Sequence, residues 1–410
     1  MSRVPNVIVL GRFNVFVGAN ASGKSNFIEL FRFIDNVRTH DLEQAIALEG
    51  GVEYFRNIGI GATRNFELEL ASDRKFPLVS RKPGPGEMQD LLGLKVNQTK
   101  YHMCVAFGKG GKGFRIVKDS MQFSGQLDAL EDRGGDRLAV ARRLGPGRIK
   151  VMVVDGQPCT EITSKEFSGG FEGTLLDQFR GRGWRTIPLL SMLSFMPLPP
   201  FEYVLDDFEV YDFDLKLAKS AVPLTGTTAL DEDGGNLAIV LSNILRSNRK
   251  KTKLFNLVKP LLPFIADVKT VRFSDKSRFF RLQETYSEDE YLPASLLSDG
   301  TIDLIAMIVA LYFEDKDAVL FEEPDRNIHP RLIVRLVDMM KDVSRNRQVI
   351  MTTHNPEVVK HAGLKNLYLV SRDNRGFSTI HKPADSRRVR AFLKDELGVE
   401  DLHTQDLLGM

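Results

Sequence analysis

The chain has 410 residues, of which 42% are hydrophobic and 27% are charged, and its 56 Lys and Arg residues against 54 Asp and Glu residues give a net charge of +2. This composition is typical of globular proteins, excludes disordered and collagen-like chains, and indicates no particular class of partner. The two cysteines, Cys104 and Cys159, cannot build a disulfide framework, and no stretch approaches the roughly 18 apolar residues of a membrane span. We therefore expect a soluble, cytoplasmic protein that does not bind membranes.

The first 40 residues predict a strand, a glycine loop and a helix. Val7 to Val17 is rich in β-branched and aromatic residues, and apolar residues recur at helical spacing from Phe27 to Ile34. Between them, Gly18 to Ser25 matches the phosphate-loop pattern GxxxxGK followed by Ser or Thr, in the strand–helix context that this pattern requires. Its glycines allow backbone N–H groups to face phosphates at a helix N-terminus. Lys24 is predicted to reach the β and γ phosphates of a nucleotide, and Ser25 to bind Mg²⁺.

The middle of the chain is harder to interpret. From Glu53 to about Lys118, short apolar alternations predict strands of an antiparallel lobe. Residues 119–224 carry glycine clusters and a weak helical pattern near 175–179, and we expect them to form an inserted, α-rich region. The expected organisation is therefore an N-terminal lobe (1–118), an insertion (119–224) and a C-terminal lobe (225–410).

Strong periodicity returns in the C-terminal lobe. Helical spacing predicts three helices, at 237–245, 254–265 and 302–313, and the last is apolar nearly all round, as in a buried helix. Three short apolar runs, at 318–321, 349–351 and 367–370, are typical of parallel strands covered on both faces. We expect the two ends of the chain to share one α/β core.

An acidic pair follows the first of these apolar runs. Glu322 and Glu323 emerge where the strand of 318–321 ends, and ligands of open α/β sheets bind at that edge. Glu322 is positioned to hold the shell of a magnesium ion, and Glu323 to orient and deprotonate an attacking water. Such a pair is also typical of a solvated loop, and the phosphate loop in the same chain favours the catalytic interpretation.

Two further motifs complete the pattern. Ser298 can cap the buried helix and, with Gly300, leaves free N–H groups for a second anion site. His354 follows the strand of 349–351 and could hydrogen-bond a γ phosphate. Taken singly, the first is an ordinary helix cap and the second a structural histidine, but their order relative to the other two motifs favours function.

In this order, the four motifs resemble those of the ABC ATPases of the chromosome-maintenance (SMC) and RecF type. A closer resemblance is to stand-alone prokaryotic ATPases related to the overcoming-lysogenization-defect (OLD) proteins, carried by the run Glu-Glu-Pro-Asp-Arg-Asn-Ile-His-Pro at 322–330. The resemblance implies an α/β ABC ATPase head, with a mixed or parallel sheet core, an antiparallel β lobe and an inserted region. Glu322 departs from the pattern, because many relatives have Asp there.

The resemblance also implies ATP and Mg²⁺ as cofactors and a set of site residues. Nucleotide contacts are expected at Gly18, Asn20, Ser22, Gly23, Lys24, Ser25, Asn26, Ser298 and Gly300. Metal contacts are expected at Ser25 and Glu322, and catalytic roles at Glu323, His354 and Asp325.

A head-to-head dimer is the expected assembly, in which ATP on the phosphate loop of one subunit touches Ser298 and Gly300 of the other. The resemblance implies a dimeric switch in prokaryotic defence against phage or plasmid, with a separately encoded effector such as a nuclease. The alternatives are a DNA-repair or chromosome-maintenance ATPase that acts on DNA directly, and a scaffold that binds ATP and barely hydrolyses it. ATPase stimulation by DNA alone would favour the first alternative.

Basic and acidic clusters outside these motifs are weaker signals. Lys and Arg gather at 246–253, 137–150 and 387–390, which is usual for a solvated face but would also suit phosphate backbones. Binding to DNA is therefore possible, although no aromatic residues alternate with these clusters to stack on bases. Asp206, Asp207, Asp212 and Asp214 are more typical of solvated strand edges than of a second metal site.

Overall fold

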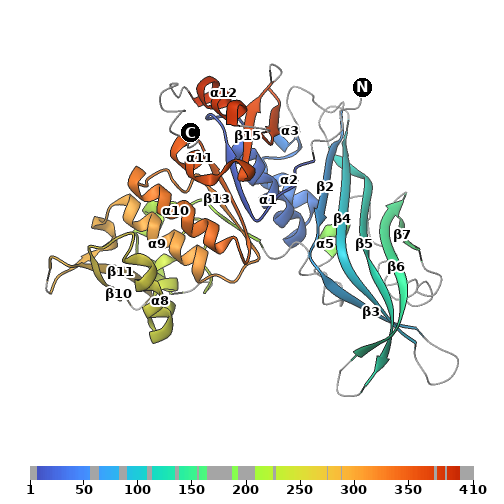
Figure 1. The fold of residues 1–410 in the computed structure, drawn as a ribbon, viewed down its shortest axis with the longest axis horizontal. Coiled ribbons are helices and arrows are strands. Elements are labelled where there is room, and N and C mark those ends of the chain that lie inside the picture. The colour runs from blue at the N-terminus through green and yellow to red at the C-terminus, as the bar shows by residue number, and fades with distance from the viewer. Residues whose placement is uncertain are drawn as a thin grey trace. The chain divides into compact units, whose positions relative to one another are not determined.

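The structure is a computed structural model and describes residues 7–55, 64–82, 90–108, 113–133, 138–154, 157–163, 187–192, 208–224, 228–274, 276–287, 289–373, 376–383 and 386–397 (Figure 1). The chain divides into two compact units. The first unit joins Met1–Leu30 to Asp207–Met410, and the second is Phe31–Asp206. No helix within the ranges given above is long and apolar enough to cross a membrane.

A six-stranded sheet forms the centre of the first unit. Its order is β16 (Ser378–His381), β15 (Leu367–Arg372), β1 (Phe13–Val17), β14 (Gln348–Thr353), β13 (Ala318–Glu322) and β8 (Phe208–Tyr211). All neighbours pair in parallel except β15 and β16. The two ends of the chain therefore share one α/β core, as expected. The N-terminal strand begins at Phe13 and is therefore shorter than the predicted run from Val7 to Val17.

The first unit also contains several helices. They are α6 (Leu215–Ala218), α7 (Leu237–Leu245), α8 (Asn248–Val258), α9 (Asp299–Tyr312), α10 (Pro330–Val343), α11 (Pro356–Ala362), α12 (Ser386–Leu397) and the first part of α1 (Lys24–Thr39), with 3-10 turns at Ala294–Leu296 and Leu364–Asn366. Every residue of α9 from Thr301 to Leu311 is buried, which confirms the predicted buried helix. The predicted helix at 254–265 is wrong in its second half, because Pro260 has no N–H group to continue α8.

A second, antiparallel sheet belongs to the same unit. It contains β9 (Val222–Pro223), β10 (Ile265–Ser274), β11 (Ser277–Glu284) and β12 (Tyr291–Pro293), with β11 pairing with the other three. The residues of one face, among them Val268, Phe280 and Leu282, belong to the same hydrophobic core as α7 and α9.

The second unit is built around long antiparallel strands. Besides the end of α1 it contains α2 (Leu42–Leu48), α3 (Val52–Phe55), α5 (Leu189–Met192) and a sheet of β2 (Phe66–Ser72), β3 (Phe76–Lys82), β4 (Asp90–Phe107), β5 (Phe114–Asp132), β6 (Leu138–Val154) and β7 (Gln157–Ile162). This confirms the expected antiparallel lobe. The pattern near 175–179 lies outside the described residues, as do Asp206 and Asp207.

The expected α-rich insertion at 119–224 differs from the structure, where the described part of that region is mainly strand. The strand β5 runs through the expected boundary at residue 118, and β6 and β7 extend the same sheet. Of the glycine clusters in this region, Gly145 and Gly147 lie inside β6, and a further glycine, Gly125, lies inside β5. A Cβ atom on Gly125 would lie 1.9 Å from the carbonyl oxygen of Lys95 on the neighbouring strand, so the close approach requires glycine. The glycine at 125 is therefore selected by packing between strands, which local composition does not reveal.

Asp119 on β5 is buried, and this predicts a pH-dependent stability. Burial raises its pKa from 3.8 to about 7, although the backbone N–H of Leu189 donates to its carboxylate and opposes the shift. Between about pH 4 and pH 7 the folded chain binds a proton that the unfolded chain does not, so stability falls as the pH rises through this window.

Asp119→Asn removes this linkage. At about pH 8 it is expected to raise the free energy of unfolding by up to about 4 kcal/mol, and this gain should shrink as the pH falls toward 5. Melting temperatures across this range test the expectation. Asp132→Asn, at the exposed end of the same strand, is the matched surface control. Parallel curves for Asp119→Asn and the parent protein would contradict the assignment.

Candidate nucleotide-binding site

The phosphate loop connects β1 to α1 in a tight turn. The N–H group of Gly18 donates to the carbonyl oxygen of Thr353 at the end of β14 (3.3 Å). A Cβ atom on Gly18 would lie 2.3 Å from the carbonyl oxygen of Val370, and one on Gly23 would lie 2.0 Å from Oγ of Ser378. Gly23 also has a φ of +105°. The fold therefore requires glycine at both positions, and it places the loop at the N-terminus of the 16-residue helix α1.

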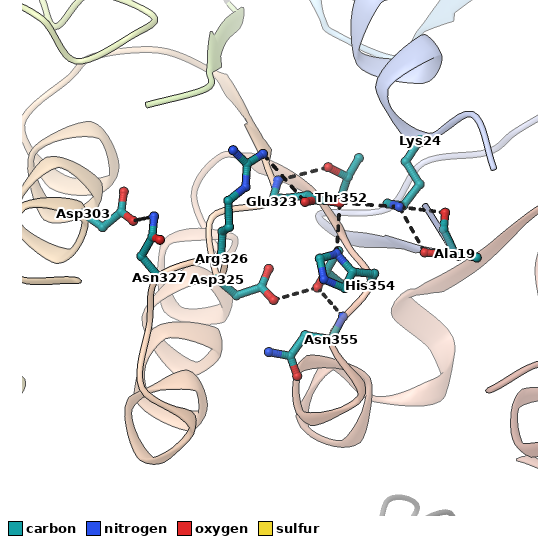
Figure 2. A network of polar contacts seen from close by, with 12 residues as sticks. Ala19, Lys24, Asp303, Glu323, Asp325, Arg326, Asn327, Thr352, His354 and Asn355 are labelled. Atoms are coloured by element: carbon teal, nitrogen blue, oxygen red, sulfur yellow. Dashed lines mark hydrogen bonds and ion pairs between the residues drawn. The ribbon is translucent and has the colours of Figure 1, made fainter. Parts of the chain in front are cut away.

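Lys24 lies beneath this loop. Its side chain is 5% exposed, and Nζ donates to the carbonyl oxygens of Gly18 and Ala19 at 3.0 Å each. The same Nζ lies 3.5 Å from Oε1 of Glu323, as Figure 2 shows. An ammonium group held by two neutral carbonyls and one carboxylate is a ready partner for phosphate oxygens.

Glu323 connects the loop to two other motifs. Its Oε1 lies 3.1 Å from Nδ1 of His354, and its Oε2 lies 3.7 Å from Arg326 (Figure 2). Its N–H group donates to Oγ1 of Thr352, because the parallel pairing of β13 with β14 aligns Glu322 with Thr352. Glu323 also has a φ of +42°, which turns the chain sharply at the edge of the sheet.

The surroundings of Glu323 determine its charge. Burial raises its pKa, but the hydrogen bond from His354 and the positive charges of His354, Lys24 and Arg326 together lower it below its ordinary value. The carboxylate therefore stays ionised at neutral pH, as a proton acceptor requires.

Asp325 lies deeper in the same edge of the sheet. It is 5% exposed and accepts a hydrogen bond from Oγ1 of Thr353 (2.9 Å), which in turn accepts one from the N–H group of Asn355 (Figure 2). Burial raises the pKa of Asp325, and the bond from Thr353 only partly offsets this. These contacts fasten the chain on both sides of His354.

Ser298 and Gly300, the residues expected at the second anion site, lie at the start of α9. Ser298 is the N-cap, accepting from the N–H group of Thr301 (3.3 Å), and its side chain is exposed. A Cβ atom on Gly300 would lie 2.6 Å from the carbonyl oxygen of Asn327, and Nδ2 of Asn327 donates to Asp303 (3.0 Å). The start of α9 is thus attached to the loop that carries Glu323.

Hydrogen bonds and ion pairs bring together Lys24, Glu323 and His354 from the predicted set, and Asp325 is bonded to Thr353, the residue before His354. Asn20, Ser25 and Asn26 are exposed on the loop and the first turn of α1, Ser22 is buried in the loop, and Glu322 is half-buried at the end of β13. Sequence reasoning assigned no role to three nearby residues. Arg326 and Asn327 lie within the motif at 322–330 and could have been considered. Ser378 lies on β16, and no sequence signal connects it to the loop, although its Oγ donates to the carbonyl oxygen of Ser22 (2.8 Å).

Both expected cofactors fit this chemistry. The buried ammonium group of Lys24 and the N-terminus of α1 suit the phosphates of a nucleotide. No group of three or more His, Cys, Asp and Glu residues that would hold a metal occurs within the described ranges. Mg²⁺ that arrives with phosphates needs only one or two protein ligands, and the hydroxyl of Ser25 and the carboxylate of Glu322 supply the right donor atoms.

A search of solved structures matches the chain to SMC heads at low sequence identity. An SMC head bound to the C-terminal winged-helix domain of ScpA is 14% identical with a TM-score of 0.45, and the match covers 93% of this chain and 94% of that one. An SMC head of Pyrococcus furiosus with an extended coiled coil, bound to the C-terminal domain of ScpA, is 12% identical with a TM-score of 0.42. That match covers 95% of this chain and 94% of that one. The SMC head of Thermotoga maritima is 13% identical with a TM-score of 0.38, and the match covers 92% of this chain and 93% of that one.

A search of curated proteins found no match. The family model described as "AAA domain, putative AbiEii toxin, Type IV TA system" matches residues 13–84 and 112–360, well over half of the chain. The protein therefore belongs to this family of AAA-type ATPase domains.

Proposed function

We propose that the protein hydrolyses ATP to ADP and phosphate with Mg²⁺, and that it acts as a nucleotide-dependent dimeric switch. The observation that carries this proposal is the position of Glu323. One carboxylate contacts the lysine of the phosphate loop and the histidine that follows the next strand, so three motifs far apart in the sequence meet at one point.

The site residues have distinct roles in this proposal. Lys24 and the N–H groups at the start of α1 bind the phosphates. Ser25 and Glu322 hold Mg²⁺, which supplies positive charge to the phosphate oxygens when bound. Glu323 accepts a proton from the attacking water, which its lowered pKa permits. His354 orients Glu323 through its Nδ1 and is free to reach the γ phosphate through its other ring nitrogen.

Asp325 has a positioning role in this proposal, although the sequence suggested a catalytic one. Its burial and its bond to Thr353 hold the end of β14, and therefore the backbone from which His354 extends. A buried carboxyl group with a raised pKa is a poor partner for phosphates, and it serves better as a structural anchor.

The second half of each site comes from another copy of the chain. Ser298 is exposed at the N-terminus of the 14-residue helix α9, on a different element from Lys24 and Glu323. A two-fold dimer would place Ser298 and Gly300 of each copy against the nucleotide on the other, as an isologous contact does. Binding of ATP would then add contacts to the dimer, and hydrolysis would remove them.

We place this switch in prokaryotic defence against phage or plasmid, among ATPases related to the OLD proteins, with a separately encoded effector such as a nuclease. The family description, which names a putative toxin of a toxin–antitoxin system, supports a defence setting. Asp212 and Asp214 are the described acidic residues considered for a second metal site, and Asp214 has a structural role, because it caps α6 by accepting from the N–H group of Lys216 (2.9 Å).

The rate of phosphate release per chain is expected to rise with protein concentration, because each site needs two copies. Steady-state phosphate release, measured across the range in which sedimentation shows monomer and dimer, tests this. A rate per chain that does not change across this range would contradict the shared site. ATP binding without phosphate release above background would instead support a nucleotide-gated scaffold.

A further inference from the structure

The antiparallel sheet of β9 to β12 has one face in the hydrophobic core, and its second face has a different composition. Val268 pairs with Leu282 across β10 and β11, and both are buried. Side chains alternate along a strand, so the neighbouring pairs Lys269–Arg281 and Val271–Phe279 lie on the opposite face.

Aromatic rings gather on this outer face. Phe273 is 72% exposed at an irregularity near the tip of β10, and its ring lies 6.0 Å from that of Phe279 at an angle of 83°. The guanidinium carbon of Arg281 lies 5.1 Å from the centre of the Phe279 ring. Nζ of Lys269 lies 4.0 Å from the centre of the ring of Tyr291 on β12. The face thus alternates flat rings with cations.

The helix α8 extends this cationic surface. Nζ of Lys251 lies 3.4 Å from Oδ1 of Asp267, and the hydroxyl of Tyr291 donates to Oδ2 of the same residue (2.8 Å). Asp267 is the one carboxylate in β10, and both of its oxygens therefore have partners. The helix also carries the exposed Arg249 and Lys250 of the basic cluster at 246–253.

We propose that this outer face, formed by Lys269, Phe273, Phe279, Arg281 and Tyr291 with Lys251 of α8, binds single-stranded nucleic acid. Unpaired bases stack on aromatic rings and on guanidinium planes, and Lys and Arg bind the phosphates between them. A duplex has its bases stacked inside and presents no face to an exposed phenylalanine. Asp289 and Glu290 precede β12, and their negative charges repel phosphates. The bound nucleic acid is therefore expected to follow the end of the sheet that carries Phe273 and Phe279.

This inference is independent of ATP binding, because none of its residues belongs to the nucleotide site. It also differs from the sequence-based expectation, in which no aromatic residues alternated with the basic cluster. In the folded chain, the pairing of β10 with β11 gathers aromatic residues on one face, and the ion pair of Lys251 with Asp267 links the basic cluster at 246–253 to that face.

The test is the fluorescence anisotropy of a fluorescein-labelled oligothymidine of about 20 nucleotides, titrated with the full chain at about 50 mM salt. Phe273→Ala is expected to weaken binding by about 5- to 100-fold, because it removes one stacking contact. Tyr286→Ala removes a comparably exposed ring (84%) in the turn between β11 and β12, and it should bind like the parent protein.

Lys269→Gln tests the phosphate contacts separately. It is expected to reduce the slope of log Kd against log salt by about 0.7, the value for one phosphate contact on a single strand. Lys360→Gln, an exposed cation on α11, should leave the slope unchanged. An oligouridine of the same length distinguishes RNA from DNA as the bound strand.

Three results would overturn the proposal. The first is equal binding by the parent protein, Phe273→Ala and Lys269→Gln, and the second is no binding of either oligonucleotide. The third is a change in self-association in Phe273→Ala without a change in oligonucleotide binding, which would make the face a contact between copies of the chain. Phosphate release without oligonucleotide should be the same in all variants, so a failure of the ATPase proposal would be recognised separately.

Discussion

Glu323→Gln is expected to slow ATP turnover by about 10²- to 10⁴-fold while ATP still binds, because the amide keeps the shape of the side chain but cannot accept a proton. Binding should become tighter. Without nucleotide, the carboxylate of Glu323 pairs with Lys24 at 3.5 Å, and incoming phosphates must compete with it. Phosphate release and equilibrium binding of a fluorescent ATP analogue measure the two effects. Turnover within a few-fold of the parent protein would exclude Glu323 as the base.

A second substitution, used together with Glu323→Gln, tests whether the site is shared between subunits. Ser298→Arg is expected to bind ATP but to prevent dimer closure, since it places bulk and an unpaired charge at the exposed start of α9. Ser298→Ala is the matched control, because it also loses the cap to Thr301 but adds no bulk. The melting temperature of Ser298→Ala measures the loss of the cap, which costs about 1 kcal/mol. Any further effect of Ser298→Arg is then due to the blocked dimer closure.

Mixing Glu323→Gln with Ser298→Arg should restore part of the ATPase activity. In each heterodimer one site carries both changes and the other carries neither, because the phosphate loop and Glu323 come from one chain and Ser298 from the other. If heterodimers form and no activity returns, either the sites are not shared or they are strictly coupled. A single-chain tandem with one intact site decides between the two.

Lys24→Ala is expected to weaken ATP binding by at least about 100-fold. The substitution removes a cation that would donate to two phosphate groups, and each charge-assisted hydrogen bond contributes about 1.5–3 kcal/mol. It also leaves the carboxylate of Glu323 facing the phosphates without the ammonium group that balances it. The fluorescent ATP analogue again provides the measurement.

Lys360→Ala serves as the matched control, because it removes an exposed lysine on α11. It should leave ATP affinity unchanged. If Lys24→Ala binds the analogue as tightly as this control and keeps its melting temperature, the phosphate-loop assignment is wrong.

The sequence by itself determined the chemistry that local motifs encode. The phosphate loop, the acidic pair at Glu322 and Glu323, and the cap at Ser298 are each contiguous, so residue types and spacing are sufficient to recognise them. The helices at 237–245 and 302–313 and the three parallel strands were also predictable, because a period of 3.6 or a short apolar run reflects burial of a local face.

Only the tertiary structure decided which of these motifs meet. Lys24 and Glu323 touch because β14 pairs with both β1 and β13, and strand order depends on non-local pairing that leaves no periodic trace in the sequence. Ser378 approaches the phosphate loop for the same reason, through the pairing of β15 with β16. The strands in the described part of 119–224 were not predicted, and Gly125 shows why: the carbonyl of Lys95 that excludes a side chain there belongs to a neighbouring strand. Local sequence thus encodes burial and turn preference, and contacts between distant segments determine where side chains converge.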